Sequence, residues 1–502
     1  MSTALAGLRR ALAEVDDLGR AAAVLEWDLE TYMPPGGVED RAAQLGTLKG
    51  LAHERFVSDQ TLRLLEAAES EAQGQDYDSD EASLLRVTRR DLELDTRIPT
   101  ELVAEAAEAS AASRSRWQEA RRRSEWSIFE PSMRKTVDIS RRMAEAIGYE
   151  RRPYDALLAR IEPGLRTVQV EALFTELKGA ILLLLGDLLE RADRVDDSVL
   201  DRELDPDRQL ALSLRVARSF GFDTERGRQD LSAHPFCVSF GPGDVRFTTR
   251  VRPTARDSSL FSSMHETGHA LYNQGIPRSL ARTPLWHGAS GGIHESQSRL
   301  WENLVGRSRA FWLYMFPILR ATFPEQLVGV EAEAYYRAVN RVRPSYIRVD
   351  ADEVTYNLHI MLRFEIENDL LEGRLEAEDV PEAWTARVRE YLGLPPPPVV
   401  QGPLQDIHWS EAPLGTFVSY TLGNVISAQL MEKAAAEIPD LEAGFSRGEF
   451  GPLLGWLQRN VYLHGRKFTP DELLQKVTGR PLTPIPWINY ARQKFGTLYG
   501  LD

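Results

Sequence analysis

The stretch His265-Glu266-Thr267-Gly268-His269 is the most informative part of this 502-residue chain. On a helix, residues four positions apart stack on one face, so both imidazoles can reach one metal ion. The glutamate between them is then placed to take a proton from an attacking water. The chain holds 9 His and 75 Asp and Glu, so roughly 0.02 chance matches are expected. The pattern predicts a catalytic zinc site; the alternative is a surface helix with two unrelated histidines.

The flanking residues predict that this motif lies in the middle of a helix. Asp257 or Ser258 can cap the N-terminus, where a negative charge also suits the helix dipole. Gly275 and Pro277 give a stop signal. Apolar residues recur between these limits at helical spacing and can bury one stripe; they are Leu260, Phe261, Met264 and Leu271.

Length and composition are those of an ordinary globular protein, with 43% hydrophobic and 27% charged residues. The net charge of −15 argues against a nucleic-acid partner. A single cysteine, Cys237, excludes a disulfide framework and fits a reducing compartment, so we expect a buried apolar thiol.

The charged N-terminal residues do not form a secretory signal. The longest aliphatic run, Ala180 to Leu185, is too short to cross a bilayer and predicts a buried helix segment. We expect a cytoplasmic protein without a membrane partner.

Most of the chain has the apolar spacing and composition of helices, notably in residues 1–25, 40–72, 80–125, 165–194 and 308–340. One region differs. Two β-rich runs, 234–240 and 245–251, flank a turn at 241–244 and predict a hairpin just before the metal-binding helix. A peptide substrate could pair with the edge of such a strand; a purely structural hairpin is the alternative.

A catalytic zinc needs three protein ligands and one open position. Glu295 is the favoured third ligand, because a Gly-, Pro- and Ser-rich loop (275–292) is followed by a second helical pattern at 293–305. That helix can return antiparallel and offer a carboxylate to the same ion. The alternative for Glu295 is an i,i+4 ion pair with Arg299, and the rival ligands are His294 and Glu302.

The chemistry follows from such a site. Zinc lowers the pKa of water toward about 7 and polarises a carbonyl group. Glu266 takes the proton and delivers it to the leaving amine. The negative oxygen that develops needs hydrogen-bond donors, and the candidates are His408 and Tyr420, although spacing alone does not place them beside the zinc.

Several segments make the chain resemble the carboxypeptidase Taq family of metallocarboxypeptidases. Trp27-Asp28, Met33-Pro34 and Tyr420-Thr421-Leu422-Gly423 look like family features, so the resemblance covers nearly the whole chain. The other shared segments lie between residues 234 and 409, and they are His234-Pro235-Phe236, Asp244-Val245-Arg246-Phe247-Thr248, His294-Glu295-Ser296-Gln297, Ile347-Arg348-Val349-Asp350-Ala351-Asp352 and Gly402-Pro403-Leu404-Gln405-Asp406-Ile407-His408-Trp409.

The resemblance implies a mainly α, saddle-like metallopeptidase with a deep central groove, the metal at its floor and a small β-hairpin or sheet beside the active site. It also implies a homodimer that removes C-terminal residues from peptides with broad specificity. Zinc is the expected metal, cobalt can substitute, and Glu295 becomes the expected third ligand. We expect residues 1–502 to form one catalytic domain, or two helical lobes flanking the groove, with the catalytic motifs in 234–425.

A carboxypeptidase must also hold the free terminal carboxylate, which an arginine fork binds bidentately. Arg348 is the first candidate and Arg246 the second; the alternative for Arg348 is a salt bridge to Asp350 or Asp352. We expect further substrate contacts from His234 and Gln405. Other candidates for the site are Asp352 and Asp406 as orienting groups, and His287 and His359. Two other functions remain open: an oligopeptidase that cuts internally, and a peptide-binding protein with a structural zinc.

Overall fold

The computed structural model describes residues 3–255 and 259–501, and most of these residues are helical, as the sequence predicts. The chain forms two compact units, each built from three segments. The first unit comprises Met1–Asp95, Asp197–Val339 and Leu430–Pro481. The second comprises Thr96–Asp196, Asn340–Gln429 and Leu482–Asp502.

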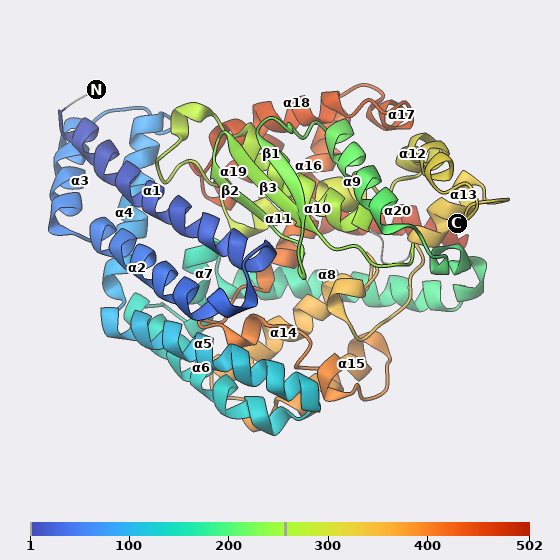
Figure 1. Ribbon diagram of the computed structural model, residues 1–502, viewed down its shortest axis with the longest axis horizontal. Helices are drawn as coiled ribbons and strands as arrows, with labels where there is room; N and C mark the ends of the chain where they lie inside the picture. Colours follow the sequence, from blue (N-terminus) through green and yellow to red (C-terminus); the bar gives the residue numbers. More distant parts are fainter. Residues whose placement is uncertain (1–2, 256–258, 502) are drawn as a thin grey trace. The chain divides into compact units, whose positions relative to one another are not determined.

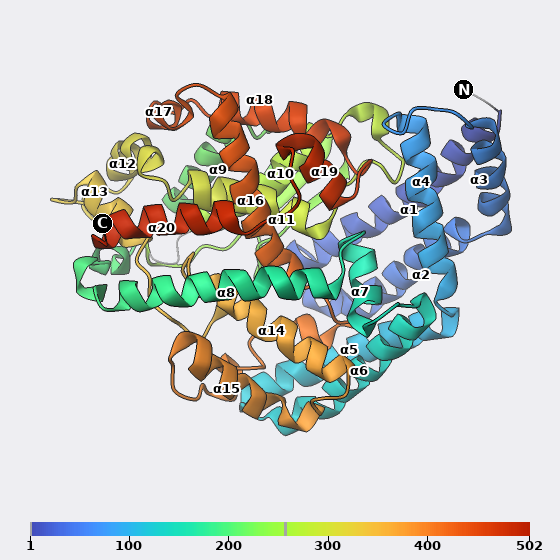
Figure 2. The same ribbon diagram turned by 180° about the vertical axis from the view of Figure 1, so that it is seen from behind.

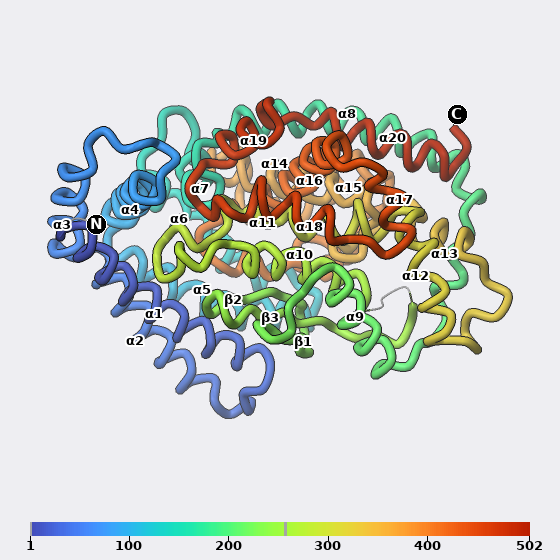
Figure 3. The backbone as a smooth tube through the Cα atoms, turned by 90° about the horizontal axis from the view of Figure 1, so that it is seen from above, coloured from blue at the N-terminus to red at the C-terminus, as the bar shows by residue number. Residues whose placement is uncertain are grey.

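The first unit holds the metal-binding motif and a small sheet among its helices (Figure 1). Its N-terminal helices α1 and α2 lie side by side (Figure 3), and Arg41 of α2 donates to the Leu25 carbonyl and to Asp28 of α1. The helices of this unit are α1 (Thr3–Thr31), α2 (Val38–Phe56), α3 (Asp59–Glu71), α4 (Asp80–Arg97), α9 (Pro206–Phe220), α10 (Ser259–Gly275), α11 (Gly291–Arg299), α12 (Arg309–Thr322), α13 (Ala332–Val339), α17 (Leu441–Ser446), α18 (Gly451–Asn460) and α19 (Pro470–Thr478).

The predicted hairpin is present as β2 (Cys237–Gly241) and β3 (Asp244–Thr249), which pair antiparallel. A further strand, β1 (Gly227–Leu231), pairs parallel with β3, so β3 is central and β2 lies at one edge. The sequence did not predict β1, because its polar residues lack the alternation of a strand. A Cβ at Gly227 would lie 2.2 Å from the Val245 carbonyl oxygen, so glycine allows the two backbones to approach.

Helix α10 (Ser259–Gly275) carries the motif and packs against β3 and β2 (Figure 1). It ends at Gly275, as predicted, and Leu260, Met264 and Leu271 are buried. The predicted caps, Asp257 and Ser258, lie outside the described residues.

The second motif helix, α11 (Gly291–Arg299), begins where the Ser290 hydroxyl accepts the backbone N–H of Ile293. It continues directly into a π-helical segment, Leu300–Val305. Such segments are rare and are frequent at functional sites.

Helices α10 and α11 approach so closely at Gly268 that no side chain fits between them. A Cβ there would lie 2.4 Å from the Gln297 carbonyl oxygen and 2.6 Å from the Ser298 Cα. Both clashes involve backbone atoms, which cannot turn aside as a flexible side chain can. Gly268 therefore sets the distance between the two helices.

Aromatic rings fill the core behind these helices. Phe220 of α9 lies 4.7 Å from Trp301 of the π-helical segment, measured between ring centroids, and 4.9 Å from Phe450. Phe311 of α12 completes the group. Each buried aromatic side chain removes a large apolar area from water, and this packing holds the π-helical segment in place.

The second unit is helical in its described part, with α8 and α20 lying side by side (Figure 2). Phe364 is at its centre, 5.2 Å from both Tyr154 and Phe174 between ring centroids. The helices of this unit are α5 (Thr100–Arg123), α6 (Trp126–Ile147), α7 (Pro153–Ile161), α8 (Thr167–Leu189), α14 (Tyr356–Leu371), α15 (Val380–Leu392), most of α16 (Val418–Glu437) and α20 (Ile485–Tyr499).

The structure corrects the predicted helices at several boundaries. The segment 40–72 is two helices, because Ser58 caps the second one through its hydroxyl. The segment 80–125 breaks before Thr100, where Pro99 precedes α5. The aliphatic run at 180–185 is not wholly buried, since Leu183 of α8 is 70% exposed. In each case a local cap, a proline or the rotation of the helix overrides the average composition.

The contact at Gly268 predicts a selective loss of stability. Gly268→Ala is expected to lower the free energy of unfolding by about 1–3 kcal/mol, because α11 must move to admit the methyl group. Gly46→Ala on the exposed face of α2 meets no atom within 4 Å and should raise it by about 0.5–1 kcal/mol. Thermal unfolding of both variants checks this; equal midpoints would contradict the packing.

Candidate functional site

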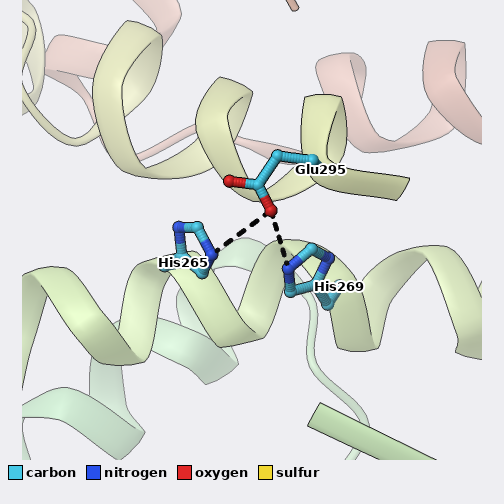
Figure 4. A group of neighbouring side chains, drawn as sticks. All are labelled: His265, His269 and Glu295. Atoms are coloured by element: carbon cyan, nitrogen blue, oxygen red, sulfur yellow. Dashed lines mark ion pairs between the residues drawn. The ribbon is translucent and has the colours of Figure 1, made fainter. Parts of the chain in front are cut away.

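Three side chains of the first unit converge on one point. Nε2 of His265 lies 3.7 Å, and Nε2 of His269 3.5 Å, from Oε2 of Glu295. Figure 4 shows both imidazoles rising from α10 toward the carboxylate of α11. These three ligand atoms lie within 4.8 Å of one another, a spacing that one metal ion can bridge.

The Nδ1 atoms of both histidines face acceptors. Nδ1 of His265 lies 2.8 Å from Oε2 of Glu302, and Nδ1 of His269 lies 3.0 Å from the His294 carbonyl oxygen. Because an acceptor fixes the proton on Nδ1, each Nε2 presents a lone pair toward Glu295. Glu302, a rival ligand in the sequence, therefore orients His265.

Glu295 uses its two oxygens differently. Oε1 accepts a hydrogen bond of 2.7 Å from Nε of Arg299, while Oε2 faces the histidines. Burial favours the neutral acid, but Arg299 and the histidines outweigh it and hold the pKa of Glu295 well below its usual range. The ion pair with Arg299 and a ligand role are thus compatible, although the sequence presented them as alternatives.

His294, the other rival ligand, lies behind His269. Its Nδ1 is 2.6 Å from Nδ1 of His269, and its Nε2 is 3.3 Å from Oδ1 of Asn273. Burial and the neighbouring His269 hold the pKa of His294 well below its usual range, so this ring is neutral. A neutral ring can accept the Nδ1–H of His269 while donating to Asn273.

Glu266 is buried, with 6% of its surface exposed. Burial raises its pKa, although His265 and His269 oppose the shift. A carboxylate with a raised pKa is a better proton acceptor. Burial, with a further contribution from the charge of Glu266, also raises the pKa of the Cys237 thiol at the start of β2. The general-base candidate therefore lies near the edge strand.

The other predicted substrate-binding residues of this unit lie on the hairpin. His234 is exposed, with Nδ1 3.1 Å from the Pro235 carbonyl oxygen. The fork of Arg246 donates to both oxygens of Asp244, at 2.8 and 2.7 Å, and its guanidinium stacks 4.4 Å from the ring of Trp27. Arg246 therefore already holds a carboxylate, as a substrate-binding arginine of the site would.

Elsewhere in the first unit, His287 is exposed, and its Nε2 lies 3.2 Å from one terminal nitrogen of Arg20. The other terminal nitrogen of Arg20 donates to the Ser239 carbonyl on β2. Through Arg20, the ring links α1 to the loop before α11.

The second unit brings together Arg348, Gln405, His408 and Tyr420. Nε2 of His408 lies 3.0 Å from the Tyr420 hydroxyl, and the Arg348 guanidinium lies 5.0 Å from the Tyr420 ring centroid. The backbone N–H of Arg348 donates to Oε1 of Gln405 at 2.8 Å. The Gln405 amide donates to the carbonyls of Tyr346 and Gln401, so its predicted substrate contact stays a prediction.

Arg348 pairs with an acid that its neighbours in sequence do not supply. Its guanidinium donates to Oδ1 of Asp406 at 3.0 and 2.9 Å, not to Asp350 or Asp352. Asp352 instead accepts backbone and hydroxyl hydrogen bonds from Thr355 at the start of α14. The predicted orienting role therefore fits Asp406, whereas the Asp352 side chain holds the turn that leads into α14.

Sequence reasoning missed two residues on α14. Arg363 also pairs with Asp406, and Glu367 accepts hydrogen bonds from Trp409 and Tyr154. They follow His359 at intervals of four, inside a helix whose other residues are mostly apolar. That spacing of ionisable residues in a buried helix was the available signal.

Among the described residues, no helix combines the length and apolar content required to span a bilayer.

Comparisons with known proteins agree with this geometry. Residues 7–495 match the model of the carboxypeptidase Taq (M32) metallopeptidase family. The chain is 41% identical to thermostable carboxypeptidase 1 of Thermus thermophilus, over 98% of each protein, and 34% identical to carboxypeptidase 1 of Bacillus subtilis, over 97% of each. The crystal structure of an M32 carboxypeptidase from Deinococcus radiodurans superposes with a TM-score of 0.96 at 45% identity, covering 99% of this chain and 100% of that one. The chain therefore belongs to the carboxypeptidase Taq (M32) family of metallopeptidases.

Proposed function

We propose that this metallocarboxypeptidase removes C-terminal residues from peptides with broad specificity, using zinc held by His265, His269 and Glu295. The observation that carries the proposal is the convergence of two Nε2 atoms and one carboxylate oxygen within 4.8 Å. Three protein ligands leave an open position, as catalytic sites require.

The donor set fits a divalent ion. Two imidazoles and one carboxylate suit zinc, and cobalt follows closely in ligand preference. The Nδ1 contacts to Glu302 and to the His294 carbonyl leave both histidines with the tautomer that a metal requires. When bound, the ion supplies Lewis-acid chemistry that activates water and polarises the scissile carbonyl.

Glu266 is proposed as the general base and acid. Its burial and raised pKa favour taking a proton from the attacking water. The same carboxyl then delivers that proton to the leaving amine. This assignment needs no other titratable group on α10.

Arg348 is proposed to bind the terminal carboxylate, with His408 and Tyr420 as donors to the developing oxyanion or to the substrate. The support is that these side chains form one cluster, in which Asp406 orients the Arg348 guanidinium. Further substrate contacts are proposed for Arg246, His234 and Gln405. A peptide is expected to pair with the edge of β2.

Other expectations from the sequence remain proposals. The single cysteine favours a cytoplasmic location, and the family likeness favours a homodimer. We also propose that residues 1–502 act as one catalytic domain with a deep groove. An oligopeptidase that cuts internally would not need the Arg348 cluster. A scaffold with a structural zinc would hold it with four ligands.

Digestion of one peptide with a free and with an amidated C-terminus tests the function. Mass spectrometry should show stepwise shortening of the free peptide from its C-terminus. A chelator should stop the reaction, and added zinc should restore it. The amidated peptide should resist, because it lacks the carboxylate that an arginine binds. Internal cleavage of both peptides would instead indicate the oligopeptidase, and no cleavage would indicate the scaffold.

Glu266→Gln should lower kcat about 10²–10⁴-fold, because the amide cannot accept the proton. Metal content, measured by atomic absorption, should be unchanged. Glu333→Gln is a matched control, because it neutralises an exposed acid of the same unit, and it should retain wild-type kcat. Activity close to wild type in Glu266→Gln would remove Glu266 from the mechanism.

Glu302→Ala should weaken zinc binding by about 10–100-fold, because His265 loses the acceptor that orients its ring. Competition with a chromophoric chelator measures this without reference to activity. Glu302→Gln keeps an acceptor oxygen and should recover part of the affinity. Equal zinc affinity in all three proteins would show that the contact does not orient the ligand.

A further inference from the structure

Helix α14 of the second unit buries three ionisable side chains in one stripe. His359, Arg363 and Glu367 are 1%, 0% and 1% exposed. Residues four apart lie on the same face of a helix, so the three side chains form one row. Two of them contact the loop before α16, residues 402–417, which carries Asp406 and His408.

Arg363 holds this loop at Asp406. It donates to Oδ2 of Asp406 through Nε at 2.8 Å and through a terminal nitrogen at 2.5 Å, and to the His359 carbonyl at 2.5 Å. Arg348 takes the other oxygen of the same carboxylate. Asp406 is thus shared by two guanidinium groups, which outweigh its burial and hold its pKa well below the usual range.

Glu367 holds the loop at Trp409. Oε1 accepts the indole N–H of Trp409 at 3.0 Å, and Oε2 accepts the Tyr154 hydroxyl at 2.8 Å. Because Arg363 and Glu367 fix residues 406 and 409, they determine where His408 lies between them.

The charges of this network depend on Glu367. Arg348 and Arg363 contribute two positive charges and Asp406 one negative charge, and His359 is neutral because burial lowers its pKa to about 3. Burial raises the pKa of Glu367 to about 7, although its hydrogen-bond donors oppose the shift. The four side chains that carry charge therefore have a net charge of +1 when Glu367 is protonated and of zero when it is ionised.

We propose that Glu367 is a positioning residue for the terminal-carboxylate site and that its charge tunes how strongly Arg348 attracts the carboxylate of a peptide. The inference rests on the proposed function of Arg348. The effect has a definite sign. Protonated Glu367 leaves the surplus positive charge and favours binding of an anion. Its ionisation removes that surplus and weakens binding, so KM should rise with pH across neutrality.

Other charged groups on the elements packed against α14 are engaged elsewhere. Arg141 of α6 donates to backbone carbonyls at the end of α14. Lys178 of α8 pairs with Glu365, and Arg152, next to α7, pairs with Glu372. Arg387 of α15 pairs with Glu365 and Asp369.

The test measures kcat and KM of the metal-loaded, full-length enzyme from pH 6 to 8.5 on an N-blocked peptide with a free C-terminus. In wild type, KM should rise about three- to tenfold across pH 7, the effect of one charge in a partly buried site. Glu367→Gln removes the charge, keeps an acceptor for the Trp409 indole and offers an N–H to the Tyr154 oxygen, so its KM should stay low and lose this rise. The control Glu365→Gln removes a charge from the same helix, where it pairs with Lys178, and should keep the wild-type profile.

Tyr154→Phe gives a second readout that a merely structural role would not produce. The Tyr154 hydroxyl lowers the pKa of Glu367, so its removal should move the rise in KM to higher pH.

Stability provides a third readout. The ordinary pKa of the carboxyl, 4.5, is raised in the folded state, so its contribution to stability is lost as pH rises from about 4.5 through 7. As pH rises over this range, the thermal midpoint of Glu367→Gln should therefore increase relative to that of wild type.

The outcomes separate this inference from the function on which it rests. If wild type does not shorten the peptide, or if Arg348→Met leaves KM unchanged, the proposed carboxylate site is wrong. If Arg348→Met raises KM but Glu367→Gln retains the wild-type rise, only the role of Glu367 is overturned. If Glu367→Gln does not fold, an unshifted KM profile in Tyr154→Phe overturns it.

Discussion

The close approach of α10 and α11 at Gly268 is the constraint on which the candidate metal centre depends. Two ligands come from one helix and the third from another, so the distance between the helix axes sets whether the three ligand atoms can meet. Gly268 lies between the two histidines, where a Cβ would meet backbone atoms of α11. The glycine is thus part of the metal site although it offers no ligand atom.

The residues around the ligands complete this geometry. Acceptors on the Nδ1 atoms determine that Nε2 of each histidine faces Glu295, and Arg299 determines which oxygen of Glu295 faces the histidines. The π-helical segment that follows α11 carries Glu302 to His265. Aromatic packing against Trp301 holds that segment. Core packing and ligand orientation are therefore parts of one arrangement.

How far the sequence predicts this protein depends on the range of each interaction. The metal helix, its end at Gly275 and the hairpin follow from local spacing and turn residues, and the structure confirms them. Strand β1 has no local signal, because its pairing with β3 alone makes it a strand. The roles of Glu302 and His294 required distances across two helices. The partner of Arg348, Asp406, lies 58 positions away, whereas the sequence offers the nearer acids Asp350 and Asp352.

The buried charges of α14 call for an explanation beyond stability. A fully buried ion pair seldom stabilises a protein more than apolar residues of the same size, because both ions lose their hydration. A gain in stability therefore does not explain why Arg363 and Glu367 are buried in the core. What they provide is two directional contacts to one loop, whereas apolar side chains would pack without fixing its orientation. The proposed binding of a substrate carboxylate by the Arg348 fork requires that orientation. The cost of burying these charges is best understood as the cost of placing Arg348 and His408.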